Sequence, residues 1–322
     1  MPWPITWNDV VAARHRIAPF ITPTPLRHYP ALDEEVGARV LVKHENHLPT
    51  NSFKVRNAIS MMTALSPAQR THGVAAATRG NHGAGLAWAG SQLGIPVVIC
   101  VPHGNNPEKN TAIRGYGAEL IEAGHDYDEA IEVARRVCLD RSMVLAHSTN
   151  NADVIAGAAT FSAEICEQAD RLDAIVVAVG GGAQAVGALV AARQLRPNVA
   201  VYAVQAQGAP AIHDSWHAKA RLTTATADTI ADGLATRSSY DFTWDALREG
   251  LEGFITVTEA QIADTIRLVV RTTHNLVEGA GATGLAGLRQ LGAKLGGKTV
   301  AVILSGGNID EATLRKVVTR EL

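Results

Sequence analysis

The sequence has few cysteines, few aromatic residues and no large excess of charge of either sign. Its three cysteines, among 322 residues, are an odd number scattered among apolar neighbours. That pattern favours a reduced, intracellular protein with buried thiols over a disulfide framework, and we expect a cytoplasmic location. Lys and Arg number 29 against 31 Asp and Glu, which leaves a formal charge of -2. Because such a surface does not attract polyphosphate, we expect no nucleic-acid partner.

The sequence also lacks a secretory signal and a continuous membrane span. The opening ten residues have no basic segment followed by an apolar run. The stretch Ala174–Ala192 is uncharged and 19 residues long, about the length that crosses a bilayer. Its centre is Gly180-Gly181-Gly182, which would weaken a continuous helix. A buried strand, a glycine turn and a helix fit better, so we expect no membrane association.

Short apolar runs rich in β-branched residues alternate with stretches of helical pattern along most of the chain. Apolar residues make up 47% of the sequence and charged residues 19%, which is typical of a globular protein long enough for two domains. Strands that are apolar throughout predict an α/β fold with mostly parallel sheets covered by helices. The predicted strands are Arg39–His44, Gly73–Ala77, Val97–Val101, Glu119–Ile121, Met143–Ala146, Ala174–Val179, Ala200–Val204 and Thr299–Leu304.

Helical patterns fill the intervals between these strands. Ser66 followed by a proline is typical of an N-cap, and Thr258 with Gln261 forms a capping box that opens a helix towards His274. The segment Gln205–Tyr240 has weak periodicity and is predicted to be irregular. The other predicted helices are Phe53–Leu65, Gly83–Leu93, Tyr127–Leu139, Gly157–Ala169 and Gln184–Leu195.

Lys54 is the first candidate for chemistry. It follows Ser52, a plausible N-cap, and so falls in the first turn of a predicted helix. The helix dipole disfavours a cation there, so the amine loses its proton more easily, as a Schiff-base lysine requires. On this segment alone, a surface lysine that happens to follow a cap is the simpler interpretation.

Two glycine-containing turns lie between a predicted strand and a predicted helix. Thr78–Gly83 could bind a carboxylate or phosphate through free backbone N–H groups, although an ordinary tight turn would also use its glycines. Gly180–Ala183 closes a buried strand and is not a Walker loop, since no Gly-Lys-Ser/Thr follows. Three adjacent glycines are hard to explain by packing alone, so here we favour a phosphate site. Ser305–Asn308 closes another buried strand and is weak evidence by itself.

Two further motifs resemble a dinucleotide site and a metal site but lack the sequence context that either site requires. Gly279–Gly284 spells the G-x-G-x-x-G of a dinucleotide site, but a helix rather than a strand precedes it and no acid follows at the required spacing. A turn between two helices is the better interpretation. His44–His47 suggests a metal site, but neighbouring strand positions point to opposite faces and no third ligand is evident.

Taken together, the four candidate segments resemble the fold-type II pyridoxal-phosphate enzymes, which share the tryptophan synthase β-like fold. The specific likeness is to the serine/threonine dehydratase (ammonia-lyase) and serine racemase family. It extends from about Ile17 to the C-terminus. The segments that carry it are Thr24–Leu26, Pro49–Lys54, Arg79–Gly83, Gly180–Gly182, Ala231–Leu234, Glu278–Gly281 and Ser305–Asn308.

The resemblance implies a role for each candidate residue. Lys54 would be the catalytic base and would carry pyridoxal 5'-phosphate as a Schiff base. Asn81 would hydrogen-bond the phenolic oxygen of the cofactor, and Ser305 would face its pyridine nitrogen. Backbone amides of Gly180, Gly181, Gly182 and Ala183 would bind the phosphate. The residues Thr78, Arg79, Gly80, Asn81 and His82 would bind the substrate carboxylate.

The implied architecture is a large cofactor domain and a small domain with the active site in the cleft between them. We expect residues 1–66 and 148–322 to form the large domain and residues 67–147 the small one. The expected assembly is a homodimer, and the partner is a small amino-acid substrate. The implied reaction is the α,β-elimination of a β-hydroxy L-amino acid of the threonine or serine type, which gives a 2-oxo acid and ammonia.

Departures from the family pattern restrict these implications. Ala183 and Gln184 stand where a fourth glycine and an apolar residue are usual, but the backbone N–H remains. Gln205 and Ala211 replace two carboxylates of metal-dependent members, with Ala209 between them, so we expect no metal site. Arg79 replaces the serine that acts as acid and base in racemases.

Several alternatives stay open beside the main interpretation. The chain could instead be a 3-hydroxyaspartate or phenylserine dehydratase, or a serine racemase, which Arg79 disfavours. A β-replacement synthase usually has Asp-Arg after the lysine, whereas Val55-Arg56-Asn57 follows here. A non-catalytic amino-acid-binding protein would keep the glycine turns without needing Lys54. For Arg79, pairing with a local acid is slightly favoured over binding a distal substrate carboxylate.

Overall fold

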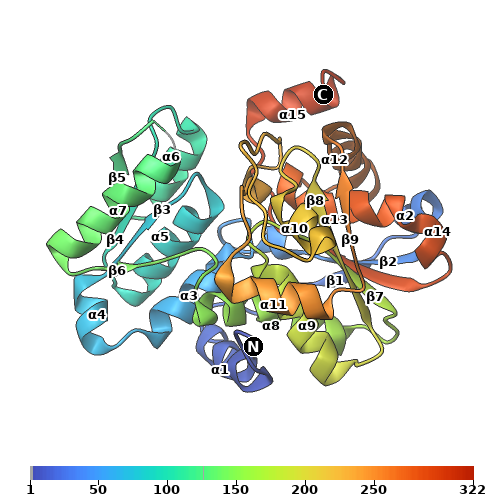
Figure 1. The fold of residues 1–322 in the computed structure, drawn as a ribbon, viewed down its shortest axis with the longest axis horizontal. Coiled ribbons are helices and arrows are strands. Elements are labelled where there is room, and N and C mark those ends of the chain that lie inside the picture. The colour runs from blue at the N-terminus through green and yellow to red at the C-terminus, as the bar shows by residue number, and fades with distance from the viewer. Residues whose placement is uncertain (1–2, 126) are drawn as a thin grey trace.

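A computed structural model, which describes residues 3–125 and 127–322, divides the strands between two sheets (Figure 1). The larger sheet has the order β1-β2-β10-β7-β8-β9, and its pairs are parallel except for the edge pair β1–β2. Its strands are β1 (Leu26–His28), β2 (Arg39–Lys43), β7 (Ala174–Ala178), β8 (Ala200–Ala206), β9 (Gly253–Val257) and β10 (Thr299–Ile303).

The smaller sheet has the order β5-β4-β3-β6 and is parallel throughout. Its strands are β3 (Val74–Ala77), β4 (Val97–Val101), β5 (Glu119–Glu122) and β6 (Val144–Leu145). The predicted α/β class is therefore confirmed, with all eight expected strands found to within about two residues. The short edge strands β1 and β9 were not predicted, because their residues are largely half-buried or exposed and form no continuous apolar run.

Helices cover both sheets, and several begin earlier than the sequence indicated. The helix α8 starts five residues before its predicted position, because the Asn151 side chain caps it by accepting a hydrogen bond from Val154 N.

The segment Gln205–Tyr240 is not wholly irregular: it contains the end of β8 and a helix, α10. The capping boxes at Ser66 and Thr258 are confirmed. The helices are α1 (Trp7–Ile17), α2 (Pro30–Val36), α3 (Lys54–Ala64), α4 (Pro67–His72), α5 (Asn81–Leu93), α6 (Pro107–Gly115), α7 (Tyr127–Arg141), α8 (Ala152–Gln168), α9 (Ala183–Leu195), α10 (Ala211–Ala218), α11 (Asp241–Gly250), α12 (Glu259–Thr273), α13 (Gly279–Gln290), α14 (Gly292–Leu295) and α15 (Glu311–Val318), with 3-10 turns η1 (Glu45–His47) and η2 (Asp232–Leu234).

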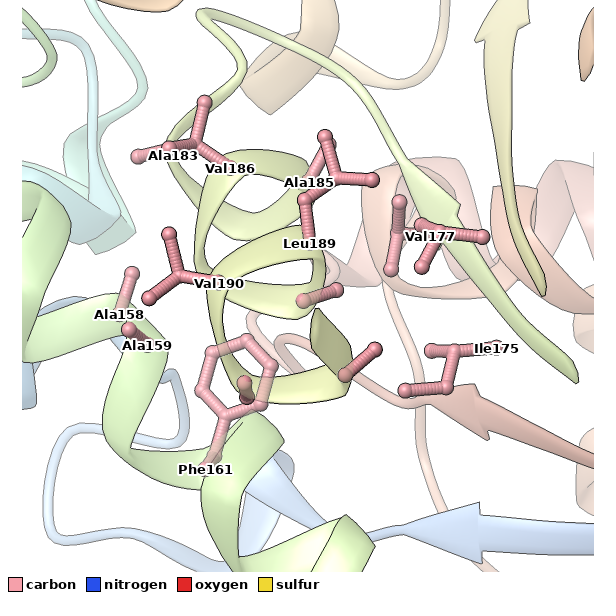
Figure 2. Close-up of a cluster of buried hydrophobic side chains, with 14 of the residues drawn as sticks. Ala158, Ala159, Phe161, Ile175, Val177, Ala183, Ala185, Val186, Leu189 and Val190 are labelled. Carbon is pink, nitrogen blue, oxygen red and sulfur yellow. The ribbon is translucent and has the colours of Figure 1, made fainter. Parts of the chain in front are cut away.

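The central strand β7 is buried on both faces, because alternate residues point to opposite sides of a strand. Ile175 and Val177 pack with α8 and α9, including Phe161 and Leu189 (Figure 2). Val176 packs on the other face, in the core that includes residues of α12 and α13. This double cover explains why the predicted strands were apolar at every position rather than at alternate ones.

The uncharged stretch Ala174–Ala192 is shared between β7 and α9, as expected, with the glycine turn between them. Among the described residues, no helix has both the length and the apolar character needed to span a membrane. The three cysteines are free, and Cys100 and Cys166 are buried.

The helix α3 lies between the two sheets and packs against both α5 and α8. Its residues Val55, Ile59 and Met62 belong to the core that includes β3 and β4 of the smaller sheet. All four strands of that sheet fall within residues 74–145, inside the segment expected to form the small domain. The boundary at residue 66 stays a prediction, since α3 precedes it and yet contributes to this core.

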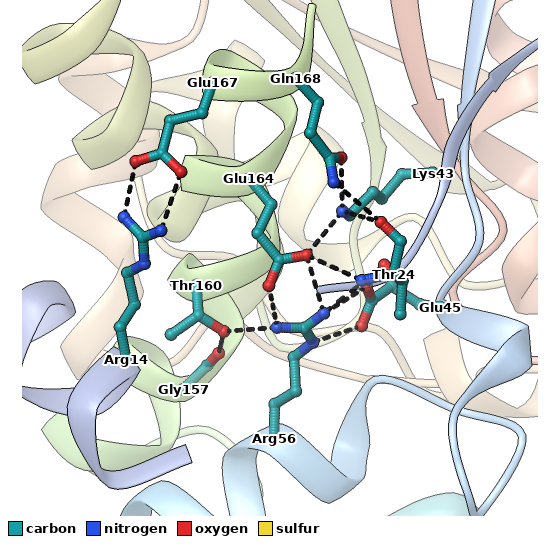
Figure 3. A network of polar contacts seen from close by, with 10 residues as sticks. All are labelled: Arg14, Thr24, Lys43, Glu45, Arg56, Gly157, Thr160, Glu164, Glu167 and Gln168. Atoms are coloured by element: carbon teal, nitrogen blue, oxygen red, sulfur yellow. Dashed lines mark hydrogen bonds and ion pairs between the residues drawn. The ribbon is translucent and has the colours of Figure 1, made fainter. Parts of the chain in front are cut away.

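A buried cluster of four charges attaches α3 to the larger sheet and to α8 (Figure 3). The Arg56 guanidinium donates to Glu45 Oε2 at 2.8 Å and to Glu164 Oε1 at 2.6 Å, and Lys43 Nζ donates to Glu164 Oε2 at 2.6 Å. All four side chains are almost inaccessible to solvent. Two cations facing two carboxylates leave no net charge, and such a buried set is stable only while it stays complete.

We expect Arg56→Leu to destabilise the fold by about 3–5 kcal/mol, because Glu45 and Glu164 would be left buried without their main counter-charge. The matched control is Arg14→Leu. It removes the exposed ion pair that joins Arg14 of α1 to Glu167, a residue of the same helix α8 as Glu164 (Figure 3). This change should cost less than about 1 kcal/mol. Urea unfolding of both variants measures the difference. Equal losses in the two variants would contradict this account of the cluster.

Candidate active site

Two of the predicted site segments lie side by side because β7 and β10 are parallel neighbours. The glycine turn follows β7 and Ser305 follows β10, so both lie at the carboxyl edge of the sheet, where open α/β sheets bind ligands. The lysine segment is attached to the same edge. Phe53 N donates to Ser305 O at 3.1 Å, and Ser52 forms a β-bridge with Gly306.

Lys54 is the first residue of α3, which confirms its predicted place in the first turn. The expected cap is wrong in detail: Phe53 is the N-cap, and the Ser52 hydroxyl accepts a longer bond of 3.4 Å from Lys54 N. Burial lowers the pKa of Lys54 to about 8, although the charge of Glu278 opposes this shift. Lys54 is therefore no ordinary surface lysine. With its pKa lowered in this way, the half-buried amine is unprotonated in a fraction of the molecules near neutral pH.

The turn Thr78–His82 joins β3 to α5, as predicted, with α5 beginning at Asn81 rather than Gly83. The first N–H groups of α5 have no acceptor within the helix, so they are available to an anion. Gly80 N differs, because it donates to Thr78 Oγ1 at 3.2 Å. The Arg79 side chain is exposed and has no ion pair within the described part of the chain. A structural pairing of Arg79 with a local acid therefore has no support among these residues and stays a prediction.

The His82 ring is buried and bonded to the protein. Its Nε2 lies 2.9 Å from the carbonyl oxygen of Ala146. Because a carbonyl only accepts, Nε2 carries the hydrogen and Nδ1 does not. Burial, together with the charge of Lys54, lowers the pKa of His82 to about 3. The ring is therefore neutral, and only the backbone N–H of this residue is free to bind a carboxylate.

The Asn81 amide is held between two side chains of the larger-sheet region. Its Nδ2 donates to Glu278 Oε1 at 2.5 Å, and its Oδ1 accepts from Asn308 Nδ2 at 2.7 Å. Burial raises the pKa of Glu278. An amide has two N–H donors, so one remains for a ligand. Glu278 was not assigned a role from sequence, because its partner lies 197 residues away along the chain.

The glycine turn forms a cradle at the N-terminus of α9, a helix of 13 residues. Gly182 is the N-cap and has φ 99°, in the left-handed region that favours glycine. A Cβ on Gly180 would lie 2.5 Å from the carbonyl oxygen of Gly233, and one on Gly181 would strike the Thr149 hydroxyl. Free N–H groups, a helix dipole and an absence of side chains fit a phosphate.

The G-x-G-x-x-G segment is neither a dinucleotide turn nor a turn between two helices. It forms the first turns of α13, after a loop. A Cβ on Gly281 would lie 2.6 Å from the carbonyl oxygen of Gly306. These small residues let α13 approach the loop that follows β10, where Ser305 is itself buried. The glycines therefore help to place Ser305 rather than to bind a nucleotide.

His147 is a second residue of this region that the sequence did not single out. Its Nδ1 accepts bonds from Thr149 N at 3.0 Å and Asn150 N at 2.9 Å. Burial and the nearby charge of Lys54 lower its pKa. No local sequence motif identifies His147, because Lys54, whose charge acts on it, is distant along the chain.

The region where the family pattern places carboxylate metal ligands is buried and contains an amide in place of an acid. Ala209 and Ala211 are buried, and Gln205 Oε1 accepts a bond from His213 N at 3.0 Å. Within residues 3–125 and 127–322, no group of three or more His, Cys, Asp or Glu side chains could hold a metal ion.

Comparison with known proteins identifies the family. The family described as pyridoxal-phosphate dependent enzyme matches residues 17–306. The chain belongs to this family. It is a pyridoxal-phosphate enzyme of the α/β, fold-type II class, and its lysine, glycine cradle and buried serine fit that cofactor.

Relatives of similar length support the assignment. The chain is 34% identical to an L-threonine ammonia-lyase of Thermotoga maritima, over 99% of this chain and 79% of that protein. It is 33% identical to an L-threo-3-hydroxyaspartate ammonia-lyase of a Pseudomonas species, over 95% and 96%. The structure of maize serine racemase is similar with a TM-score of 0.93 and 30% identity, over 99% and 98%.

We expect Gly180→Ala to raise the dissociation constant of pyridoxal phosphate by about tenfold or more, because its Cβ would push the Gly233 backbone away from the cradle. Titration of the cofactor-free protein, followed by protein fluorescence, measures this. Gly115→Ala is the control, since nothing lies within 4 Å of a Cβ at that position. An unchanged affinity in Gly180→Ala would show that the turn does not bind the phosphate.

Proposed function

We propose that this enzyme removes water and then ammonia from a β-hydroxy L-amino acid of the serine or threonine class. The observation that carries the proposal is Lys54, a half-buried amine with a pKa of about 8 beside two anion-binding helix N-termini. One helix start suits the phosphate of the cofactor and the other suits the carboxylate of an amino acid. Ammonia-lyases named for threonine and for hydroxyaspartate among the relatives support the same reaction class.

Each proposed role uses a group whose position is described above. Lys54 binds the cofactor covalently and, once released, takes the proton from Cα of the substrate. The amides of Gly180, Gly181, Gly182 and Ala183 bind the phosphate. The remaining N–H of Asn81 reaches the phenolic oxygen, and the first N–H groups of α5 hold the substrate carboxylate.

Ser305 favours elimination over transamination. Pyridoxal phosphate supplies an electron sink for the carbanion that forms at Cα. A neutral serine hydroxyl does not require the pyridine nitrogen to be protonated, so the sink is weak. With such a weak sink, loss of the β-hydroxyl would be favoured over reprotonation of the cofactor, and the product released would hydrolyse to a 2-oxo acid and ammonia.

Racemisation is the less favoured activity for this site. It needs an acid and base on the second face of the substrate, and a guanidinium, which keeps its proton, cannot serve there. Arg79 stands in that segment, so we propose that D-serine formation is negligible. Arg79→Ser is the substitution most able to introduce it, and chiral chromatography of the amino-acid pool measures the outcome.

The decisive experiment is a panel of L-serine, L-threonine, 3-hydroxyaspartate and phenylserine, scored by 2-oxo acid release. Lys54→Ala should abolish turnover and the borohydride-fixable link between protein and cofactor. A matched control is Lys294→Ala, since that lysine lies over Tyr202 on the outside of the larger sheet. A Lys54→Ala variant that still fixes the cofactor, or a wild type inactive on the whole panel, would overturn the proposal.

We expect turnover to be independent of added divalent cations, because Gln205 and Ala211 supply no carboxylate. EDTA should change the rate by less than about twofold, and magnesium should not raise it. A large and reversible activation by magnesium would show that ligands come from elsewhere in the protein. The control is the same assay with potassium chloride at equal ionic strength.

A homodimeric assembly and a cytoplasmic location also stay proposals. The free cysteines suit a reducing compartment. Sedimentation of the cofactor-loaded protein tests the assembly.

A further inference from the structure

The ion pair between Lys109 and Asp232 lies between the two anion-binding turns. Lys109 Nζ is 2.6 Å from Asp232 Oδ2. Lys109 belongs to α6 beside the smaller sheet, whereas Asp232 belongs to η2 beside the larger one. The pair therefore joins the two halves of the molecule across the site.

Lys109 contacts one of the two turns, and the residue that follows Asp232 contacts the other. The stem of Lys109 covers Gly80, because a Cβ built on Gly80 would lie 3.0 Å from its Cδ and 3.8 Å from Nζ. Asp232 is followed by Gly233, whose carbonyl oxygen approaches Gly180 in the phosphate cradle. The ion pair therefore lies next to the turn that we propose holds the substrate carboxylate.

Lys109 is the better-enclosed member of the pair. Its side chain is 13% exposed, whereas that of Asp232 is 60% exposed. Lys109 also lines a cavity of about 230 Å³ together with Gly80, Asn81 and Asn308. The cation is thus fixed in place by packing, while its carboxylate partner lies at the surface and can move into solvent.

Other acids near Lys109 include Glu108, which lines the same cavity, and Glu278 and Asp310. The charge of Lys109 opposes the rise that burial causes in the pKa of Glu278, and it contributes to the lowered pKa of Asp310. Glu278 is bonded to Asn81, and Asp310 caps α15 by accepting from Thr313 N at 2.8 Å. Because both carboxylates have other partners, Asp232 is the exchangeable one.

We propose that Lys109 binds a second, distal carboxylate of the substrate, and that Asp232 occupies that position when no such substrate is bound. The inference rests on the proposed function and names its substrate class: β-hydroxy amino acids with a side-chain carboxylate. It assigns to Lys109 the role that Arg79 was considered for, since Arg79 is exposed and does not line the cavity.

The test compares L-threo-3-hydroxyaspartate with L-serine in the cofactor-loaded enzyme. Lys109→Met keeps the stem over Gly80 and removes the charge. We expect KM for hydroxyaspartate to rise about ten- to a hundredfold, the loss of one charge-assisted hydrogen bond. The expected change in KM for serine, and in kcat for both substrates, is less than about threefold. Asp232→Asn should lower KM for hydroxyaspartate, because it removes the competing carboxylate.

The matched control is Arg114→Met, which removes an exposed cation from the same helix and its surface pair with Glu122. A binding measurement free of turnover uses succinate and butyrate as probes in calorimetry. Succinate should bind the wild type more tightly than butyrate does, and Lys109→Met should remove that difference.

The outcomes separate this inference from the proposed function. Equal losses on serine and hydroxyaspartate in Lys109→Met, or turnover of serine but not of hydroxyaspartate by the wild type, would overturn the role of Lys109 and leave the lyase intact. A selective loss in Arg79→Gln but not in Lys109→Met would also overturn it. No 2-oxo acid from any substrate would instead refute the lyase.

Discussion

The position of Lys54 depends on a buried, charge-balanced cluster around Arg56, two residues farther along the same helix. Arg56 is bonded to Glu45 beside β2 and to Glu164 on α8, and Lys43 completes the set. Because Lys54 and Arg56 share the first turn of α3, bonds that fix one restrict the other. A hydrophobic substitute of equal volume could give equal stability. The ionic version also fixes direction, since each guanidinium N–H must meet its own oxygen.

The site itself is built from charges that are only partly neutralised. Lys54 faces Glu278, and burial lowers the pKa of the amine while raising that of the acid. Both shifts favour the uncharged forms, which suits the role of nucleophile and base that we propose for Lys54. The ion pair between Lys109 and Asp232 joins α6, beside the smaller sheet, to η2, beside the larger one.

Glycines set how closely these parts approach one another. Gly180 touches η2, Gly281 touches the loop after β10, and Gly85 packs against the backbone of Lys54. In each case a Cβ would lie within 3 Å of backbone atoms of another segment. These positions link segments distant in sequence, so their role is visible only when the partner is known. From sequence, Gly281 was part of a segment that spells a dinucleotide motif, and Gly180 was part of the predicted phosphate turn.

The sequence by itself determined the α/β class, the eight strands, the place of Lys54 in the first turn of a helix and the glycine turn after β7. Those features depend on local periodicity and on residues next to one another in the chain. It did not reveal β1 and β9, whose half-buried residues form no apolar run, or the helix α10. Tertiary structure decided that Glu278 meets Asn81, that His82 bonds a carbonyl, that Arg79 stays exposed and that Lys109 covers Gly80. Each of these depends on which distant backbone passes nearby, and no local pattern of residues carries that information.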